Sequence, residues 1–219
     1  MDADAVEIRV LGCLLEKQRT TPDAYPLSLN ALRLACNQST NRDPVVEYDE
    51  TDIRAALDRL TRRGWARLAS GPGSRAVKFR HLLGDELRLS DAELAVLCVL
   101  MLRGPQTPGE LKQRTERLHP FGSLNEIETV LEGLADREFA ERLPRRPGQK
   151  EQRHRQLLGG EPAEEGQPLR EEPGPQPFVA EAGGDDVRLA ELERELVRLR
   201  DEVAELRAVL ASLRRERDF

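Results

Sequence analysis

Basic side chains gather on one predicted helix, over residues 51–63, and on the hairpin predicted directly after it. Guanidinium and ammonium groups at such positions can contact the phosphates of a nucleic acid. The phosphate-contacting candidates are Arg54, Arg59, Arg62 and Arg63 on the helix and Arg75, Lys78 and Arg80 around the hairpin turn.

The loop that precedes this helix carries side chains of the kind that can read base edges, namely Asn37, Gln38, Asn41 and Arg42. A structural interpretation stays open for both groups. The acids Asp49, Glu50, Asp52 and Asp58 balance the arginines and could form ordinary helical ion pairs. Asn37 and Asn41 could equally serve as helix-cap and turn residues.

No catalytic or metal-binding arrangement is recognisable in the sequence. The three cysteines, Cys13, Cys36 and Cys98, lie far apart in apolar helical patterns, so we expect reduced core residues. Three histidines, without paired cysteines or HExxH-like spacing, do not assemble a zinc site. We therefore expect a protein that is not an enzyme and that holds no metal or cofactor.

An internal repeat predicts the elements that position the basic side chains. Two segments match at an offset of 74 to 75 residues, and each reads as three helices followed by a hairpin. This order is typical of a winged helix, a helix-turn-helix variant. The matching residues include Ile53, Leu57, Leu60, Arg63 and Trp65, which recur as Ile127, Leu131, Leu134, Arg137 and Phe139.

The second copy differs from the first in the charge of its third helix. Acids dominate there, so contact with phosphates would bring like charges together. A protein partner or the neighbouring domain suits this face better. The acids are Glu126, Glu128, Glu132, Asp136 and Glu138.

The segment after the repeats holds the whole acidic excess of a chain with formal net charge -6. Residues 161–186 contain one Arg and eight acids, together with many Pro and Gly, so we expect a flexible linker. A heptad seam follows, which predicts a parallel coiled-coil homodimer, with a single helix packed on a domain as the alternative. The seam residues are Leu189, Leu192, Leu196, Leu199, Val203, Leu206, Leu210 and Leu213.

The predicted fold class is mainly α with small β-hairpins, arranged as tandem winged-helix domains plus a C-terminal coiled coil. The predicted boundaries are residues 1–83, 84–160, 161–186 and 187–219. The longest apolar run, Leu94 to Leu102, is too short for a membrane span and indicates a buried helix. With no secretory signal pattern at the N-terminus, we expect a cytoplasmic protein without membrane contact.

Several stretches resemble the YceH-like family of uncharacterised bacterial proteins. The resemblance implies a tandem winged-helix fold, in agreement with the repeat, and implies no activity. It covers the chain to about Leu158. The stretches are Gly12-Cys-Leu-Leu-Glu-Lys-Gln-Arg-Thr-Thr-Pro22, Tyr25-Pro-Leu-Ser-Leu-Asn30, Ala35-Cys-Asn-Gln-Ser-Thr-Asn-Arg-Asp-Pro44, Leu102-Arg-Gly-Pro-Gln-Thr-Pro-Gly-Glu-Leu111 and Arg146-Pro-Gly-Gln-Lys-Glu151.

Two functions fit these observations. One is a dimeric, regulator-like protein whose first copy binds duplex DNA; the other is a scaffold whose winged helices bind protein partners. The sequence favours the first by a narrow margin. A continuous positive strip over the third helix and hairpin would indicate DNA, whereas a patchwork of charges would indicate a protein partner.

Overall fold

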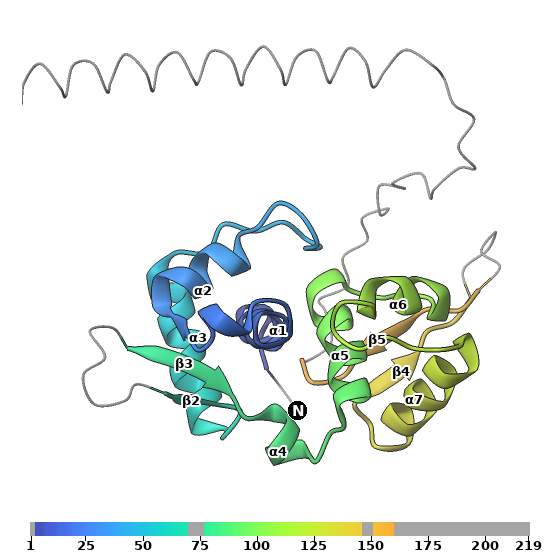
Figure 1. The fold of residues 1–219 in the computed structure, drawn as a ribbon. Coiled ribbons are helices and arrows are strands. Elements are labelled where there is room, and N and C mark those ends of the chain that lie inside the picture. Colours follow the sequence, from blue (N-terminus) through green and yellow to red (C-terminus); the bar gives the residue numbers. More distant parts are fainter. Residues whose placement is uncertain (1–2, 70–76, 146–150, 160–219) are drawn as a thin grey trace, which may run out of the picture. The chain divides into compact units, whose positions relative to one another are not determined.

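The structure is a computed structural model that describes residues 3–69, 77–145 and 151–159 (Figure 1). All of these belong to the first of two units, residues 1–165 and 166–219, into which the chain divides. The described part is mainly helical with small antiparallel sheets, which confirms the predicted fold class at this level. None of its helices is long and apolar enough to cross a membrane.

The first repeat contains three main helices and a three-stranded sheet. Its sheet has the order β1-β3-β2, and both strand pairs are antiparallel. The elements are α1 (Ala5–Thr20), a short 3-10 helix (Pro22–Ala24), β1 (Leu27–Ser28), α2 (Leu29–Cys36), α3 (Glu50–Arg62), β2 (Ala66–Leu68) and β3 (Lys78–His81).

The second repeat follows the same order after the short helix α4 (Leu83–Leu87). An antiparallel bridge between Gln106 and His154 stands where β1 stands in the first repeat. The remaining elements are α5 (Asp91–Arg103), α6 (Pro108–Thr115), α7 (Leu124–Asp136), β4 (Ala140–Arg142) and β5 (His154–Gln156), and β4 pairs with β5.

The six main helices among the described residues begin where local side chains can satisfy their free backbone N–H groups. Each N-cap side chain accepts a hydrogen bond from the N–H three residues further on, as such residues commonly do. In four helices an acid at that third position also binds the N-cap N–H, which completes a capping box. The N-caps are Asp4, Ser28, Asp49, Ser90, Thr107 and Ser123, with capping boxes at Asp4, Asp49, Ser90 and Thr107.

The first helices of the two repeats pack against each other and join both copies into one hydrophobic core (Figure 1). Every residue from Leu94 to Leu102 is buried, as predicted for this apolar run. Gly12 permits the close approach, because a Cβ there would lie 2.9 Å from Cδ2 of Leu102. All three cysteines are buried and free, which confirms the prediction for them.

Three elements of the described residues were not predicted from the sequence. The first is the short 3-10 helix Pro22–Ala24. Strand β1 has only two residues, and its partners in β3 lie about fifty positions further along the chain. Helix α4 has five residues and begins at the predicted boundary between residues 83 and 84. The predicted linker, 161–186, and the predicted coiled coil, 187–219, lie outside the described residues.

Candidate functional site

Helix α3 of the first repeat carries most of the predicted phosphate contacts. Its Ile53, Leu57 and Leu60 are buried in the core, so the opposite face is turned to solvent. Asp49 and Asp52 close a capping box at the start of the helix. The helix therefore presents one polar face whose charges decide what it can bind.

Arg59 of α3 and Arg63, the C-cap residue of that helix, are held by carboxylates at the start of α1. Arg59 lies 2.5 Å from Oδ2 of Asp4 and 3.2 Å from Oε2 of Glu7. Nε of Arg63 lies 3.3 Å from Oε1 of Glu7, and its guanidinium covers the Trp65 ring at 5.7 Å. The side chain of Glu7 is only 2% exposed, whereas Asp4 is 49% exposed, so α3 and its C-cap residue are linked to α1 through one buried and one exposed carboxylate.

The second repeat reproduces the Arg63 arrangement on its own residues. Arg137 lies 3.0 Å from Glu93 and covers the Phe139 ring at 4.8 Å. Glu7 and Glu93 both occupy the third position of a capping box on the first helix of their repeat. Because the copy with an acidic third helix has the same contact, we assign Arg63 a structural role.

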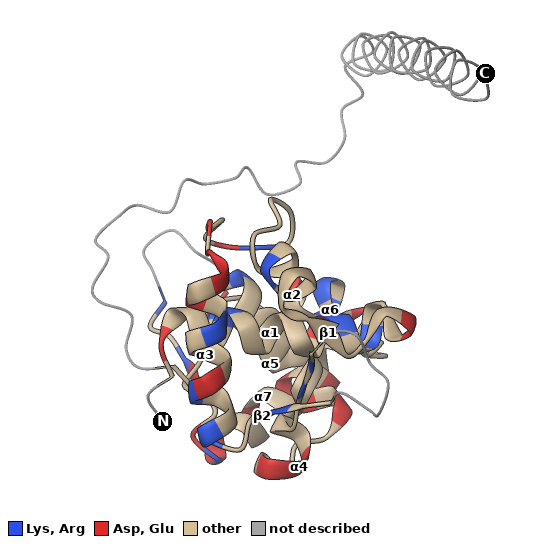
Figure 2. Cartoon of the chain, turned by 90° about the vertical axis from the view of Figure 1, so that its left-hand side faces the viewer, with Lys and Arg blue, Asp and Glu red and all other residues tan. Residues whose placement is uncertain are grey.

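The exposed stripe of α3 alternates in charge. Arg54, Asp58 and Arg62 follow one another at four-residue intervals, and all three are exposed. Nε of Arg62 donates to the backbone oxygen of Asp58 at 3.3 Å. Figure 2 shows basic and acidic residues interleaved along α3 rather than one continuous basic strip.

The hairpin beside α3 combines basic and apolar side chains. Arg67 of β2 lies opposite Arg80 of β3, and Lys78 begins β3. Leu68 and Val77 are 59% and 55% exposed, so the hairpin presents two apolar side chains to solvent. Arg75, the remaining predicted phosphate contact on the hairpin, lies outside the described residues.

The predicted base-reading residues take part in an internal polar network. The side chain of Arg42 is fully buried and pairs with Glu16 of α1 at 2.6 Å. Asn37 ends α2, and its amide exchanges two hydrogen bonds with the backbone of Tyr48. Oε1 of Gln38 accepts a hydrogen bond from Arg42 at 2.8 Å. These three side chains therefore stabilise the loop between α2 and α3.

Asn41 is the exposed member of the predicted base-reading set. Its backbone has a φ of 60°, in the left-handed region that asparagine tolerates better than most residues. Its side-chain oxygen accepts a hydrogen bond from Arg103 at the end of α5. This contact joins the loop of the first repeat to the second repeat.

Helix α7 of the second repeat presents the acidic face that the sequence predicts. Its predicted acids are all exposed, Glu126, Glu128, Glu132, Asp136 and the following Glu138. A cavity of about 430 Å³ lies between α7 and the second hairpin, and three of these acids line it together with Arg142 and Glu151. The negative face and the cavity beside it disfavour contact with a polyanion.

The described residues contain no group of three or more His, Cys, Asp or Glu side chains that could hold a metal ion. Burial, with the nearby charge of Arg80, lowers the pKa of His81 to about 4, so this imidazole is neutral at pH 7. Its Nε2 lies 2.5 Å from Oε1 of Gln18, where it helps to hold β3 against α1.

The geometry defines a class of protein: a duplicated, mainly helical unit with a small sheet in each copy and a polar face of mixed charge. The family model for "Protein of unknown function, DUF480" matches residues 3–149. The chain belongs to this family.

Three relatives named UPF0502 protein match along most of their length. That of Citrifermentans bemidjiense is 51% identical over 195 residues, 88% of this chain and 87% of its own length. That of Pelobacter propionicus is 51% identical and covers 93% of each chain. That of Azoarcus sp. is 49% identical over 99% of this chain and 95% of its own length. These relatives support the family resemblance seen in the sequence.

Proposed function

We propose that the chain is a cytoplasmic, non-enzymatic interaction protein in which each repeat is a winged helix used to bind a protein partner. The strand order β1-β3-β2 behind three helices supports the winged-helix assignment for the first repeat. The observation that carries the proposed function is the charge pattern of α3. Arg59 of α3 and its C-cap residue Arg63 are paired with carboxylates at the start of α1, and Asp58 lies between the two remaining arginines, Arg54 and Arg62.

The partner surface comprises Arg54, Asp58 and Arg62 on α3 together with Leu68 and Val77 on the hairpin. A surface of this kind suits a protein partner, because apolar side chains contribute burial while charges of both signs at the rim select the partner. A polyanion would gain little from it, because phosphates would meet Asp58 and the acidic start of α3. The acidic face of α7 supplies a second surface for a protein contact.

Binding to duplex DNA is the second candidate function. The winged-helix topology places a third helix where it can enter the major groove. Arg54 and Arg62 remain exposed on that helix, and Arg80 faces Arg67 across the hairpin. With Arg75 and Lys78 these residues form a reduced phosphate-contacting set that leaves out Arg59 and Arg63, because both are paired with carboxylates of the first repeat.

A salt titration separates the two functions. Fluorescence anisotropy of a random labelled duplex is measured with the wild-type chain and with Arg54→Glu/Arg62→Glu at several salt concentrations. We expect no salt-sensitive binding by either protein. Binding by the wild type that the double variant loses, with a slope of log K against log salt reduced by about 0.9 per lost phosphate contact, would instead establish DNA binding.

A matched pair of variants tests the protein surface directly. Leu68→Ser/Val77→Ser removes the exposed apolar side chains of the hairpin, whereas Val45→Ser alters an equally exposed valine, at 57%, away from it. In affinity capture from a bacterial lysate, a partner should be retained by wild type and Val45→Ser and lost with the double variant. Equal capture by all three proteins would contradict the assigned surface.

A further inference from the structure

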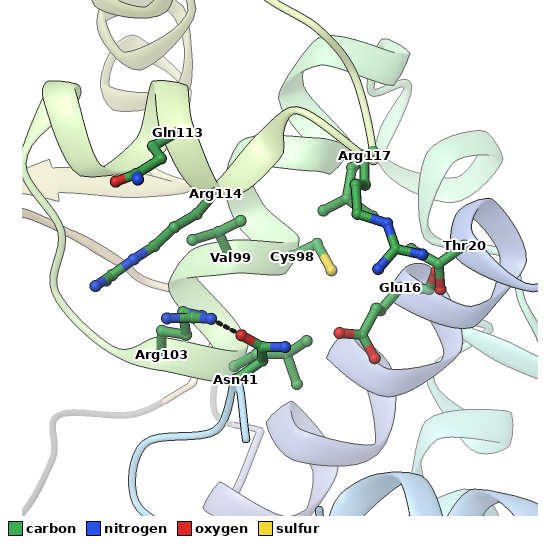
Figure 3. A pocket seen from close by; sticks show the side chains of 11 residues that line it. Glu16, Thr20, Asn41, Cys98, Val99, Arg103, Gln113, Arg114 and Arg117 are labelled. Carbon is green, nitrogen blue, oxygen red and sulfur yellow. Dashed lines mark hydrogen bonds between the residues drawn. The ribbon is translucent and has the colours of Figure 1, made fainter. Parts of the chain in front are cut away.

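A cavity of about 440 Å³ opens where the two repeats meet, between α1, α5, α6 and the loop after α2 (Figure 3). Arg103, Arg114 and Arg117 reach it from the second repeat, and Glu16, Thr20 and Asn41 reach it from the first. In Figure 3, Arg117 extends across the opening toward Thr20, and Arg103 extends toward Asn41. The volume lies in the range of pockets that hold small ligands.

Two of these arginines, Arg114 and Arg117, are not paired with a carboxylate in the part of the chain that the structure describes. Nη1 of Arg114 donates to the neutral amide oxygen of Gln106. Arg117 forms no ion pair within residues 3–69, 77–145 and 151–159. The arginines that are paired with a carboxylate are Arg19, Arg42, Arg59, Arg63, Arg137, Arg153 and Arg155.

Glu16 is the acid that lines the cavity, and its charge is already balanced. Its carboxylate accepts both Nη groups of Arg42, at 3.1 and 2.6 Å, and lies 3.3 Å from Nζ of Lys17. Burial would raise the pKa of Glu16, but the Arg42 and Lys17 contacts outweigh it and lower that pKa. The positive charges of Arg114 and Arg117 are therefore not cancelled by Glu16.

The floor of the cavity is apolar. Cys98, Val99 and Leu102 of α5 form it together with Leu118. The Cys98 thiol donates to the backbone oxygen of Gly12, and burial raises its pKa well above the ordinary value, so the thiol remains neutral. The cavity thus combines guanidinium groups at its rim with a surface that favours carbon atoms.

We propose that this cavity binds a small organic anion with two or more negative charges, such as a tricarboxylate or a phosphate ester. Arg114 and Arg117 bind its anionic groups through charge-assisted hydrogen bonds, with Arg103 and Asn41 at the rim, and its carbon skeleton rests on the floor. A ligand in this place contacts both repeats at once and holds α6 against α1. The proposal does not depend on the partner of the α3 face.

The concave shape favours a small ligand over a nucleic acid. A duplex presents its phosphates on a convex backbone, whereas this open cavity is lined by residues of three helices and the loops beside them. The α3 face, through which a winged helix would read DNA, carries charges of both signs and contributes no residue to the lining of the cavity. Competition by duplex DNA is therefore an informative outcome of the test.

Calorimetric titration of the full chain with citrate and with inorganic pyrophosphate tests the proposal, with sodium chloride at matched ionic strength as reference. We expect at least one probe to bind at one site per chain. Arg114→Gln/Arg117→Gln should weaken binding at least about tenfold, because both charged donors are lost. Arg114→Lys/Arg117→Lys should recover part of the affinity relative to the glutamine variant. Lysine restores the positive charge but not the planar, bidentate donor geometry of the guanidinium group.

A charge-matched control removes two arginines that lie outside the cavity, in Arg33→Gln/Arg88→Gln, and should bind the probe like the wild type. Circular dichroism establishes that each variant is folded. Absence of binding by both probes, or equal weakening in the control, would overturn the proposal. Displacement of the bound probe by random duplex DNA, with loss of DNA binding in Arg114→Gln/Arg117→Gln, would reassign the arginines to a nucleic-acid surface.

Discussion

At the scale of single residues, Arg42 shows how a buried charged side chain can hold a loop against two helices. All five of its N–H donors have an acceptor: the backbone oxygens of Ala35 and Asn41, both carboxylate oxygens of Glu16, and Oε1 of Gln38. A buried guanidinium is tolerated only with such complete satisfaction. The loop between α2 and α3 is therefore anchored to α1 and α2 through the side chain of Arg42.

Replacing this anchor should destabilise the protein strongly. In Arg42→Met, Glu16 loses its main partner and three further acceptors lose their donor, so we expect the free energy of unfolding to fall by about 3 kcal/mol. Urea denaturation followed by circular dichroism measures the change. Adding Glu16→Gln should restore part of the loss, and an additive double variant would show that the two side chains do not act as a pair.

His81 makes stability depend on pH in the acid range. Its folded pKa of about 4 lies below the ordinary value of 6.5 because burial, and then the charge of Arg80, disfavour the imidazolium. The stabilisation is present above pH 6.5 and is lost as the pH falls toward 4. The difference corresponds to roughly 3 kcal/mol at about 1.4 kcal/mol per unit.

In His81→Gln the free energy of unfolding should change less between pH 6.5 and 4 than in the wild type. Urea denaturation at several pH values measures both slopes. Parallel curves for the two proteins would show that His81 does not titrate with folding.

At the scale of elements, the sequence predicts those features that depend only on neighbouring residues, such as the starts of helices. Helix starts at Asp4, Ser28 and Asp49 were predicted, because N-cap chemistry depends on neighbouring residues. Roles that depend on distant partners were not predictable. Arg42 was assigned to base reading, since nothing near it in the sequence indicates the pairing with Glu16, 26 residues away.

The repeat did contain a signal for one missed role. Arg63 and Trp65 recur as Arg137 and Phe139, and the acid at the third position of each first helix completes the contact. A residue that recurs on a basic helix and on an acidic helix is better explained by the fold than by a ligand. The recurrence of Arg63 as Arg137 in the second repeat therefore indicates the structural role of Arg63.

The contact between α1 and α5 can be tested with two glycines that differ only in their surroundings. A Cβ at Gly12 would meet Leu102 at 2.9 Å and Met101 at 3.1 Å, whereas a Cβ at Gly133 in α7 has nothing within 4 Å. Gly12→Ala should lower stability by about 1 to 3 kcal/mol through overpacking. Gly133→Ala should raise it by up to about 1 kcal/mol through helix propensity.

Thermal denaturation of both variants beside the wild type measures the two shifts. If Gly12→Ala were as stabilising as Gly133→Ala, the helices would not be packed as closely as described. Gly133→Ala also controls for the general effect of replacing glycine in a helix.

At the scale of the whole molecule, the shared core predicts that residues 1–160 unfold as one unit without the C-terminal tail. Separating the repeats would expose α5, whose middle nine residues are buried. A chain of residues 1–160 should show one urea transition by both circular dichroism and fluorescence of Trp65, which reports on the first repeat. Two separate transitions would indicate independent domains.

The C-terminal segment should make the full chain a dimer. The heptad seam from Leu189 to Leu213 and opposite charges at its flanks, such as Glu195 with Arg200, motivate a parallel pair. Sedimentation equilibrium should give a dimer for the full chain and a monomer for residues 1–160. A monomer at every concentration for the full chain, or for residues 180–219 alone, would contradict the prediction.

The pairing of Ala3 with Gly159 has a practical consequence for protein engineering. The N–H of Ala3 donates to the oxygen of Leu158 at 3.2 Å, and the two segments form a parallel bridge. Because Ala3 and Gly159 lie next to each other, a linker of a few residues would join these two positions, and new termini could be opened at an exposed turn. The fold is thus suited to circular permutation, which would free the tail to be moved to another face of the molecule.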